Sequence, residues 1–348
     1  MRALVVHQWT KFENLKIEEW PSPKVIPGHV KIRTQAVGMN FALSLRVEGK
    51  YQIKPQLPFV PGVELCGYVI EVGEGVTRFK PGDRVTSFVT FGAFGEEAIA
   101  PEHRTFKLPD SLPFYKAVGY TTSFMTTYAA LVWPQWFNLQ FGETIVVHGA
   151  AGGVGLVAIE IAKILGATVV ATCGSDKKVE VCRDHGADYV VNYRNADFRA
   201  KVLEVTNNIG ANAVYDPVGG DVFMQSLRCL APEGRIMPIG FAGGTVPQIP
   251  ANFLLVKNVK VLGFNLGYYN GQWGRDDRHQ DMGKRFETQI RHGMDQLFRW
   301  TEEGRIRPEI SHVFPFSQYK EAMAAVLGRD AIGRVAVAFD EEAKRLNV

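Results

Sequence analysis

The stretch VVHGAAGGVGLVAIEIA (146–162) decides the fold. An apolar run is followed by four glycines within seven residues and then by apolar residues at helical spacing. This order predicts a strand, a tight turn and a helix, which is the context of a dinucleotide-binding βα unit. Small residues let the backbone approach a pyrophosphate, and a helix N-terminus offers it N–H donors. Taken alone, the loop leaves a tight turn without ligand as the alternative.

The sequence around this loop alternates between two periodicities. Strand-like runs (TIVVHG, TVVATC, YVVNY, NAVYDPV, RIMPIG and VKVLGF) are separated by helix-like segments at 154–165, 177–185, 198–206, 221–230 and 250–257. Six strands joined by five helices predict a doubly wound parallel Rossmann sheet.

The first part of the chain has a different distribution of strands and turn residues. Short alternating strands broken by Pro and Gly predict a mainly antiparallel, partly barrel-like β domain over residues 1–125. The tail offers a helix from about Met282 to Glu303, a strand HVFPF, a helix SQYKEAMAAVLG and a strand GRVAVAF, too few strands to fold alone. We therefore expect one domain from 1–125 plus 268–348, with the Rossmann domain, 126–267, inserted in it.

Composition restricts the partners. The chain has 348 residues, with 39 basic and 36 acidic side chains. A formal charge of +3 is too small to indicate a nucleic-acid or anionic membrane surface, so a small-molecule partner is expected. The longest apolar tract, 155–174, contains Glu160 and Lys163 and does not predict a membrane span. Four scattered cysteines without a CxxC pair predict free thiols and a cytoplasmic protein.

The end of the second strand indicates which dinucleotide is bound. NAD-binding folds place an acid there for the ribose 2′-hydroxyl, whereas this chain has Cys173-Gly174-Ser175 followed by Lys177 and Lys178. A hydroxyl and cations suit a 2′-phosphate, which favours NADPH. Asp176 still offers a carboxylate to a ribose hydroxyl, and lysines in a first helical turn are often simply solvated.

The expected dinucleotide contacts follow the carboxyl ends of the predicted strands. The candidate cofactor-binding residues are Ala151, Gly152, Gly153, Val154, Gly155, Gly174, Ser175, Lys178, Tyr193, Arg194, Gly240, Phe241, Phe264 and Asn265. Arg194 is equally consistent with a solvated surface charge.

A family resemblance covers nearly the whole chain. The series VGMNFAL, GKYQIKPQLPFVPGVELCGYVIEVGEGV, FKPGDRV, MTTYAAL, VVHGAAGGVG, GADYVVNYR and GRVAVAF resembles the medium-chain dehydrogenase/reductase superfamily. More narrowly, it resembles the zinc-free NADPH:quinone oxidoreductase, zeta-crystallin-like, branch. The resemblance implies a GroES-like β domain around the Rossmann domain and an active site in the cleft between them.

The residues at the metal positions of that superfamily differ from those of its zinc enzymes. Asn40 stands where the zinc alcohol dehydrogenases carry a cysteine, and Val63 where they carry a histidine. Residues 85–110 also lack the cysteine cluster that holds their structural zinc. We therefore expect no metal at these positions and no Lewis-acid activation of an alcohol. His103 and His148 are isolated and are interpreted as structural.

A reaction driven by NADPH without metal is hydride transfer to a quinone or to the β-carbon of an α,β-unsaturated carbonyl, because both acceptors are already electrophilic. By resemblance, Asn40, Tyr51 and Thr126 surround the nicotinamide as the catalytic candidates. Their alternatives are a turn residue, a cleft-lining aromatic and a helix cap, respectively. Leu43 replaces an aspartate that the family often carries, which affects the expected hydrogen bonding of that loop.

The acceptor itself is not specified by the sequence. The aromatic cleft candidates are Phe41, Tyr51, Phe91, Tyr268, Tyr269 and Trp273. An enoyl-thioester reductase is the alternative within the fold, and a non-catalytic NADPH-binding or interaction protein is the alternative from another class, since the branch includes members resembling lens crystallins and membrane-trafficking factors. A homodimer is predicted through 259–266, an edge strand blunted only by Lys260.

Overall fold

The computed structural model of the chain describes residues 1–271, 283–328 and 330–348. Two compact units divide it. Unit 1 comprises Met1–Met125, Gly267–Glu302 and Pro308–Val348, and unit 2 comprises Thr126–Leu266 and Glu303–Arg307. Two residues named from the sequence, Met282 and Trp273, lie outside the described residues.

Unit 2 is built on one six-stranded sheet in the order β10-β9-β8-β11-β12-β13. The strands are β8 (Thr144–Val147), β9 (Thr168–Cys173), β10 (Tyr189–Asn192), β11 (Ala211–Asp216), β12 (Leu230–Pro238) and β13 (Lys260–Val261). The connecting helices are α4 (Gly155–Ile164), α5 (Asp176–Asp184), α6 (Phe198–Val205), α7 (Gly220–Arg228) and α8 (Ala251–Lys257). Every pair of neighbouring strands is parallel, which confirms the predicted doubly wound sheet.

The strand order gives this sheet a switch point. From β8 the chain builds outward through β9 to β10, and it then returns to the other side of β8 to build β11, β12 and β13. Open α/β sheets bind ligands at the carboxyl ends of the strands beside such a reversal. Val146 and Val147 of β8 point to opposite faces of the sheet, and both are completely buried, as are the adjacent Val170 and Ala171 of β9. Both faces of this sheet are therefore covered.

The last strand of unit 2 is shorter than predicted. VKVLGF was expected to continue as a strand, but β13 pairs with β12 only at Lys260 and Val261, followed by a single bond from the Leu262 N–H to the Ile236 carbonyl. The partner strand ends at Pro238, which has no N–H for a further ladder bond.

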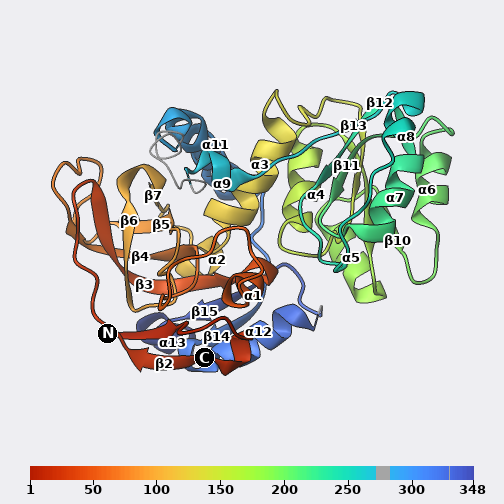
Figure 1. The fold of residues 1–348 in the computed structure, drawn as a ribbon. Coiled ribbons are helices and arrows are strands. Elements are labelled where there is room, and N and C mark those ends of the chain that lie inside the picture. The colour runs from red at the N-terminus through yellow and green to blue at the C-terminus, as the bar shows by residue number, and fades with distance from the viewer. Residues whose placement is uncertain (272–282, 329) are drawn as a thin grey trace. The chain divides into compact units, whose positions relative to one another are not determined.

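Unit 1 contains a seven-stranded, mainly antiparallel sheet in the order β14-β15-β3-β4-β5-β7, with β6 also paired to β3. Its strands are β3 (His29–Met39), β4 (Glu64–Val72), β5 (Arg84–Phe88), β6 (Glu97–Pro101), β7 (Thr105–Lys107), β14 (Ile310–Pro315) and β15 (Arg334–Ala338), and β1 (Arg2–Val5) pairs separately with β2 (Lys16–Glu19). Figure 1 shows β15 from the end of the chain beside β3 from its beginning. The tail therefore completes the sheet of the first part, as expected.

The remaining helices outside the Rossmann repeat are α1 (Phe41–Val47), α2 (Phe114–Ala117), α3 (Met125–Val132), α9 (Leu266–Tyr269), α11 (Glu287–Glu302), α12 (Tyr319–Leu327) and α13 (Asp340–Leu346). No helix in the described part of the chain is long and apolar enough to cross a membrane.

A buried ion pair fixes the returning tail in unit 1. Arg334 of β15 pairs with Glu64 of β4, and both side chains are almost completely buried. A Cβ atom on Gly38 of β3 would lie 2.5 Å from the Arg334 guanidinium, so glycine makes room for the pair. Removing one partner of such a pair is strongly destabilising because a charge is left uncompensated.

Candidate cofactor and active site

The glycine loop forms the tight turn that the sequence predicts. Gly149 has a φ of 54°, and the Gly152 and Gly155 N–H groups donate to the carbonyls of Gly149 and Gly152 at 2.9 and 3.0 Å. A Cβ atom on Gly155 would lie 2.5 Å from the Ala150 carbonyl oxygen. Only glycine therefore lets α4 begin directly against the loop. The N-cap residue Val154 supplies no side-chain hydrogen bond, so protein side chains leave the first turn of α4 uncapped.

A buried pair of hydroxyls supports this loop, and the sequence analysis missed it. The Thr127 hydroxyl lies 2.8 Å from the Tyr215 hydroxyl of β11, and both side chains are completely buried. Thr127 also donates to the Val154 carbonyl at 3.5 Å. Burial raises the pKa of Tyr215, so this phenol stays neutral and serves as a structural partner. The only available signal was the second threonine of MTTYAAL.

The residues predicted around the ribose phosphate come together at the end of β9. A Cβ atom on Gly174 would lie 2.5 Å from the Tyr193 hydroxyl, so this half-exposed phenol lies against Gly174. Ser175 is the extended N-cap residue of α5, and its hydroxyl makes no capping bond. The Asp176 carboxylate accepts from the Asn192 amide at 2.8 Å, which engages the one acid near this position.

Lys178 and Arg194 occupy different surroundings beside this group. Lys178 is half-buried in the first turn of α5, two residues after Asp176. Arg194 is exposed, and its backbone N–H donates to the Asn192 side chain at 3.2 Å. Lys178 thus lies on the same short segment as Ser175. The surroundings of Arg194 fit both a cofactor contact and a solvated surface charge.

The loops after β11 and β12 are bound to each other. The buried Asp216 carboxylate accepts from the backbone N–H groups of Val218 and Gly219 at 2.7 and 3.1 Å. Desolvation raises the pKa of Asp216, and these two bonds oppose the shift. The Ala242 N–H donates to the Pro217 carbonyl at 3.0 Å, which keeps the 240–242 segment beside this turn. Gly240 and Phe241 therefore lie at the carboxyl edge of the sheet, and Phe241 is 38% exposed.

Phe264 and Asn265 follow β13 at the same edge. The Phe264 ring packs against Trp136, with 5.2 Å between ring centroids, and Asn265 is exposed. The structure thus brings the predicted cofactor residues of unit 2 to the carboxyl ends of the parallel strands.

Asn40 is placed in unit 1 by helix α1. It is the N-cap residue, and its side-chain oxygen accepts from the Leu43 N–H at 2.9 Å. The backbone N–H at position 43 donates the capping bond, so the bond does not depend on the side chain at this position. This bond fixes the amide oxygen toward the helix, and the NH₂ group of the same side chain supplies two donor hydrogens. A ligand carbonyl oxygen is the matching acceptor.

Tyr51 is held by a residue that the sequence analysis did not single out. The guanidinium carbon of Arg46, in the last turn of α1, lies 3.9 Å from the centroid of the Tyr51 ring. Arg46 is only 7% exposed, and burial lowers the pKa of its guanidinium, which the nearby Tyr51 hydroxyl partly opposes. The Tyr51 ring is half-buried, and its backbone N–H donates to the Leu45 carbonyl at 3.2 Å.

Thr126 and the described aromatic candidates belong to different units. Thr126 is a half-buried residue of α3 and belongs to unit 2, whereas Asn40 and Tyr51 belong to unit 1. The exposed aromatic candidates are Phe41, Phe91 and Tyr268. Tyr269 is 8% exposed and packs edge-on against Phe286 at 4.7 Å, which favours a core role.

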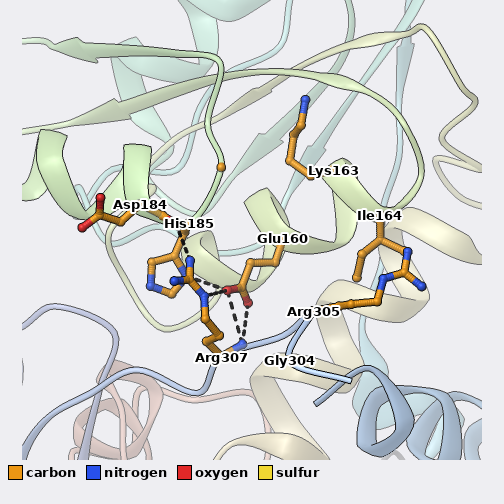
Figure 2. Close-up of a pocket in the computed structure, with 9 residues that line it drawn as sticks. Glu160, Lys163, Ile164, Asp184, His185, Gly304, Arg305 and Arg307 are labelled. Carbon is orange, nitrogen blue, oxygen red and sulfur yellow. Dashed lines mark hydrogen bonds and ion pairs between the residues drawn. The ribbon is translucent and has the colours of Figure 1, made fainter. Parts of the chain in front are cut away.

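A hollow of about 430 Å³ lies in unit 2 toward the C-terminal end of α4. Figure 2 shows the buried Glu160 carboxylate facing His185 and Arg307. Glu160 accepts from His185 Nδ1 at 2.8 Å and from the Arg307 backbone N–H at 3.1 Å. Lys163 pairs with Asp188 at 2.8 Å. These charges are already satisfied by protein groups, and Glu160 explains why Glu303–Arg307 clusters with unit 2 although its sequence neighbours do not.

The described residues contain no group of three or more His, Cys, Asp or Glu side chains arranged to hold a metal ion. Val63 and Asn40 stand at the positions compared above with the zinc enzymes, and the Asn40 side-chain oxygen is committed to its helix cap.

The chain has a parallel sheet with a glycine loop, inserted in a mainly antiparallel β domain. This arrangement defines a class of two-domain dehydrogenases and reductases. Comparison with known proteins indicates the same class. Residues 26–110 match the family model of the alcohol dehydrogenase GroES-like domain, and residues 153–279 match that of the zinc-binding dehydrogenases.

Three relatives place the chain within this class. The chain is 37% identical over 311 residues to a quinone oxidoreductase-like protein 2 homolog of Nematostella vectensis, with 88% of this chain and 81% of the relative covered. The human synaptic vesicle membrane protein VAT-1 homolog is 30% identical, with coverage of 96% and 86%. The crystal structure of Escherichia coli quinone oxidoreductase complexed with NADPH superimposes with a TM-score of 0.86 at 26% identity, covering 97% of this chain and 100% of that one.

The chain belongs to the medium-chain dehydrogenase/reductase superfamily, in its quinone oxidoreductase branch.

Proposed function

We propose that this oxidoreductase uses NADPH, without a metal, to reduce a quinone or an α,β-unsaturated carbonyl compound. Unit 2 serves as the NADP(H)-binding domain and unit 1 as the substrate domain. The observation that carries the proposal is the glycine loop: Gly155 sets α4 against it with no side-chain cap, at the reversal of the parallel sheet. A helix start of this kind favours a pyrophosphate.

The choice of NADPH rests on the end of β9. Ser175 and Lys178 offer a hydroxyl and a cation, while Asp176 is engaged by Asn192. A carboxylate in the place of Ser175 would repel a 2′-phosphate, whereas a hydroxyl and an ammonium group form favourable hydrogen bonds with it.

The proposed chemistry needs little from the protein besides position and donors. NADPH supplies the hydride. Hydride addition to the β-carbon of an enone, or to a quinone, leaves negative charge on the acceptor oxygen, and preorganised donors stabilise that charge. The Tyr51 hydroxyl is the proposed donor. The Asn40 NH₂ group, on the amide whose oxygen caps α1, is suited to hold a carbonyl of the acceptor or of the carboxamide. Thr126 is the third proposed site residue.

Steady-state NADPH oxidation with quinones, enones, enals and enoyl thioesters tests the proposal. Turnover of quinones or enones, unchanged after dialysis against a chelator, is the expected result. Preference for enoyl thioesters would support the alternative within the fold. Tight NADPH binding with no turnover of any acceptor would support the other alternative, a non-catalytic binding protein. This alternative is tested because the chain is also similar to the VAT-1 homolog. Stoichiometric zinc whose removal abolishes activity and whose return restores it would contradict the metal-free mechanism.

Two further proposals concern the protein's state in the cell. We propose a homodimer through β13 and the residues up to 266, because β13 is an edge of the sheet and Lys260 is its one charged residue. A concentration-independent monomer in sedimentation would refute it.

We also propose a cytoplasmic location, since all four cysteines are free thiols. Fractionation of cells carrying the tagged protein tests this.

A further inference from the structure

Arg46 is an unusual residue for its position in unit 1. Only 7% of this residue is exposed to solvent. Within the described ranges 1–271, 283–328 and 330–348, its guanidinium forms no ion pair with a carboxylate. Buried arginines are normally paired with an acid, because desolvating an unpaired charge is costly. The close partner that the structure does show is the face of the Tyr51 ring, 3.9 Å from the guanidinium carbon.

This contact fixes the plane of the phenol. A guanidinium stacked over an aromatic face is attracted by the negative charge of that face, and the attraction strengthens when both groups are removed from water. The hydroxyl of tyrosine lies in the plane of its ring. Holding the ring in one plane therefore also fixes the direction in which the hydroxyl donates its hydrogen bond.

Helix α1 connects this contact to Asn40. Asn40 caps the first turn of the seven-residue helix, and Arg46 lies in its last turn. The chain then turns back, with the Lys50 and Tyr51 N–H groups donating to the Leu45 carbonyl at 2.8 and 3.2 Å. One short element thus determines where both proposed donors of unit 1 are found. A substitution at Arg46 therefore affects Tyr51 in two ways: through the contact between the two side chains and through the backbone hydrogen bonds to the Leu45 carbonyl.

We propose that Arg46 is a positioning residue that holds the Tyr51 phenol in the orientation needed to donate to the acceptor oxygen. This inference rests on the proposed function, in which Tyr51 is the donor. Arg46 itself touches neither acceptor nor cofactor in this scheme. Its contribution to the rate passes entirely through the Tyr51 hydroxyl, which makes the two residues thermodynamically coupled.

A double-mutant cycle tests the coupling. Arg46→Met retains much of the side-chain length but removes the cation, and Tyr51→Phe retains the ring but removes the hydroxyl. With an enone, we expect Arg46→Met to lower kcat about 10-fold or more in the wild-type background, with the dissociation constant of NADPH unchanged. In the Tyr51→Phe background the same change is expected to cost less than about 2-fold, because the hydroxyl that Arg46 orients is already gone.

Two further variants control the experiment. Arg33→Met removes a half-exposed arginine of the same unit, which pairs with Glu341 at 3.4 Å, and is expected to leave kcat unchanged. Arg46→Lys keeps a cation, so it should lose less activity than Arg46→Met. It also keeps the cycle measurable if the methionine variant does not fold.

The outcomes separate this inference from the function on which it rests. Equal losses from the Arg46 variants with and without the Tyr51 hydroxyl would show a general structural role and overturn the inference. So would a large effect of Tyr51→Phe combined with wild-type kcat in Arg46→Met. If Tyr51→Phe itself retains the wild-type kcat for every acceptor, the donor assignment fails first, and the role of Arg46 fails with it.

Discussion

The glycine loop of unit 2 and helix α1 of unit 1 are built by opposite means. In the loop, small residues leave backbone groups accessible, and Gly155 is essential because a Cβ atom has no room. Around α1, the structure depends on side-chain contacts: the Asn40 oxygen accepts from the Leu43 N–H, and Arg46 covers the Tyr51 ring. The loop is suited to binding a phosphate through the main chain, whereas α1 is suited to directing individual donors.

This difference predicts that the two regions control different kinetic constants. Changes in the loop should act on NADPH affinity, and changes around α1 should act on the rate of hydride transfer at saturating NADPH. A mutation in one region that changed the constant assigned to the other would break the division.

The largest effect is expected from Gly155→Ala. The added Cβ would lie 2.5 Å from the Ala150 carbonyl oxygen and 2.6 Å from that of Gly149, and these backbone atoms can move only together with the loop. We expect the loop to be displaced and NADPH binding to become unmeasurable by fluorescence titration. Gly263→Ala is the matched control, because nothing lies within 4 Å of its Cβ position and unchanged binding is expected. Wild-type affinity in Gly155→Ala would show that the loop does not hold the cofactor.

Tyr51→Phe is expected to act on rate alone. Loss of a donor to a developing oxyanion lowers kcat by about 10- to 1000-fold, here without change in NADPH affinity. An enone and a quinone should both be tested, because a very electrophilic quinone needs less help. A weakened affinity with unchanged kcat would contradict the division between the two regions.

The double substitution of Ser175 and Lys178 by alanine tests cofactor choice. Loss of charge-assisted phosphate contacts should weaken NADPH by about 1–3 kcal/mol, or roughly 5- to 150-fold, and leave NADH nearly unaffected. Titration with both dinucleotides measures the difference. Equal losses would mean that the 2′-phosphate lies elsewhere.

The last prediction concerns stability, not binding or rate, and a histidine that supports the start of the loop. His148 is 1% exposed between Thr172 and Ser226, at 2.8 and 2.7 Å, and burial lowers its pKa to about 3. The unfolded chain binds this proton near pH 6.5, so stability should be constant above that pH and fall as pH decreases toward 3, with a slope of about 1.4 kcal/mol per pH unit.

Denaturant unfolding of wild type and His148→Gln from pH 7.5 to pH 4 measures this slope. On unfolding below pH 6.5, the variant should take up about one proton fewer than the wild type, so its stability should fall less steeply with decreasing pH. Above pH 7, both proteins should show the same pH dependence. An equal slope in the two proteins would show that another group carries the acid sensitivity.

The same contrast explains what could be predicted from the sequence. The parallel sheet and the position of the glycine loop follow from strand and helix periodicity, because each apolar run is short, buried and bounded by a turn. The return of β15 to β3 was expected because the tail could not form a sheet alone. The early end of β13 depends on Pro238 in its partner strand. The sequence of β13 alone does not show which residue it pairs with.

The contacts of the candidate site were less accessible. Arg46 on Tyr51, Thr127 on Tyr215 and Tyr193 on Gly174 each join residues whose proximity depends on turns or on long separation in sequence. Sequence reasoning selected Asn40 and Tyr51 through the family resemblance. It did not show that the Asn40 side-chain oxygen caps helix α1 through the Leu43 N–H.

The central claim is that the chain transfers a hydride from NADPH to an electrophilic acceptor. Incubation of chelator-treated protein with an enone and NADPH deuterated at both C4 positions, followed by mass spectrometry and NMR of the product, tests it most directly. One deuterium at the β-carbon of the saturated ketone per NADPH consumed is the predicted result. Bound NADPH that remains unoxidised with every quinone and enone offered, or a product without deuterium from the cofactor, would contradict it.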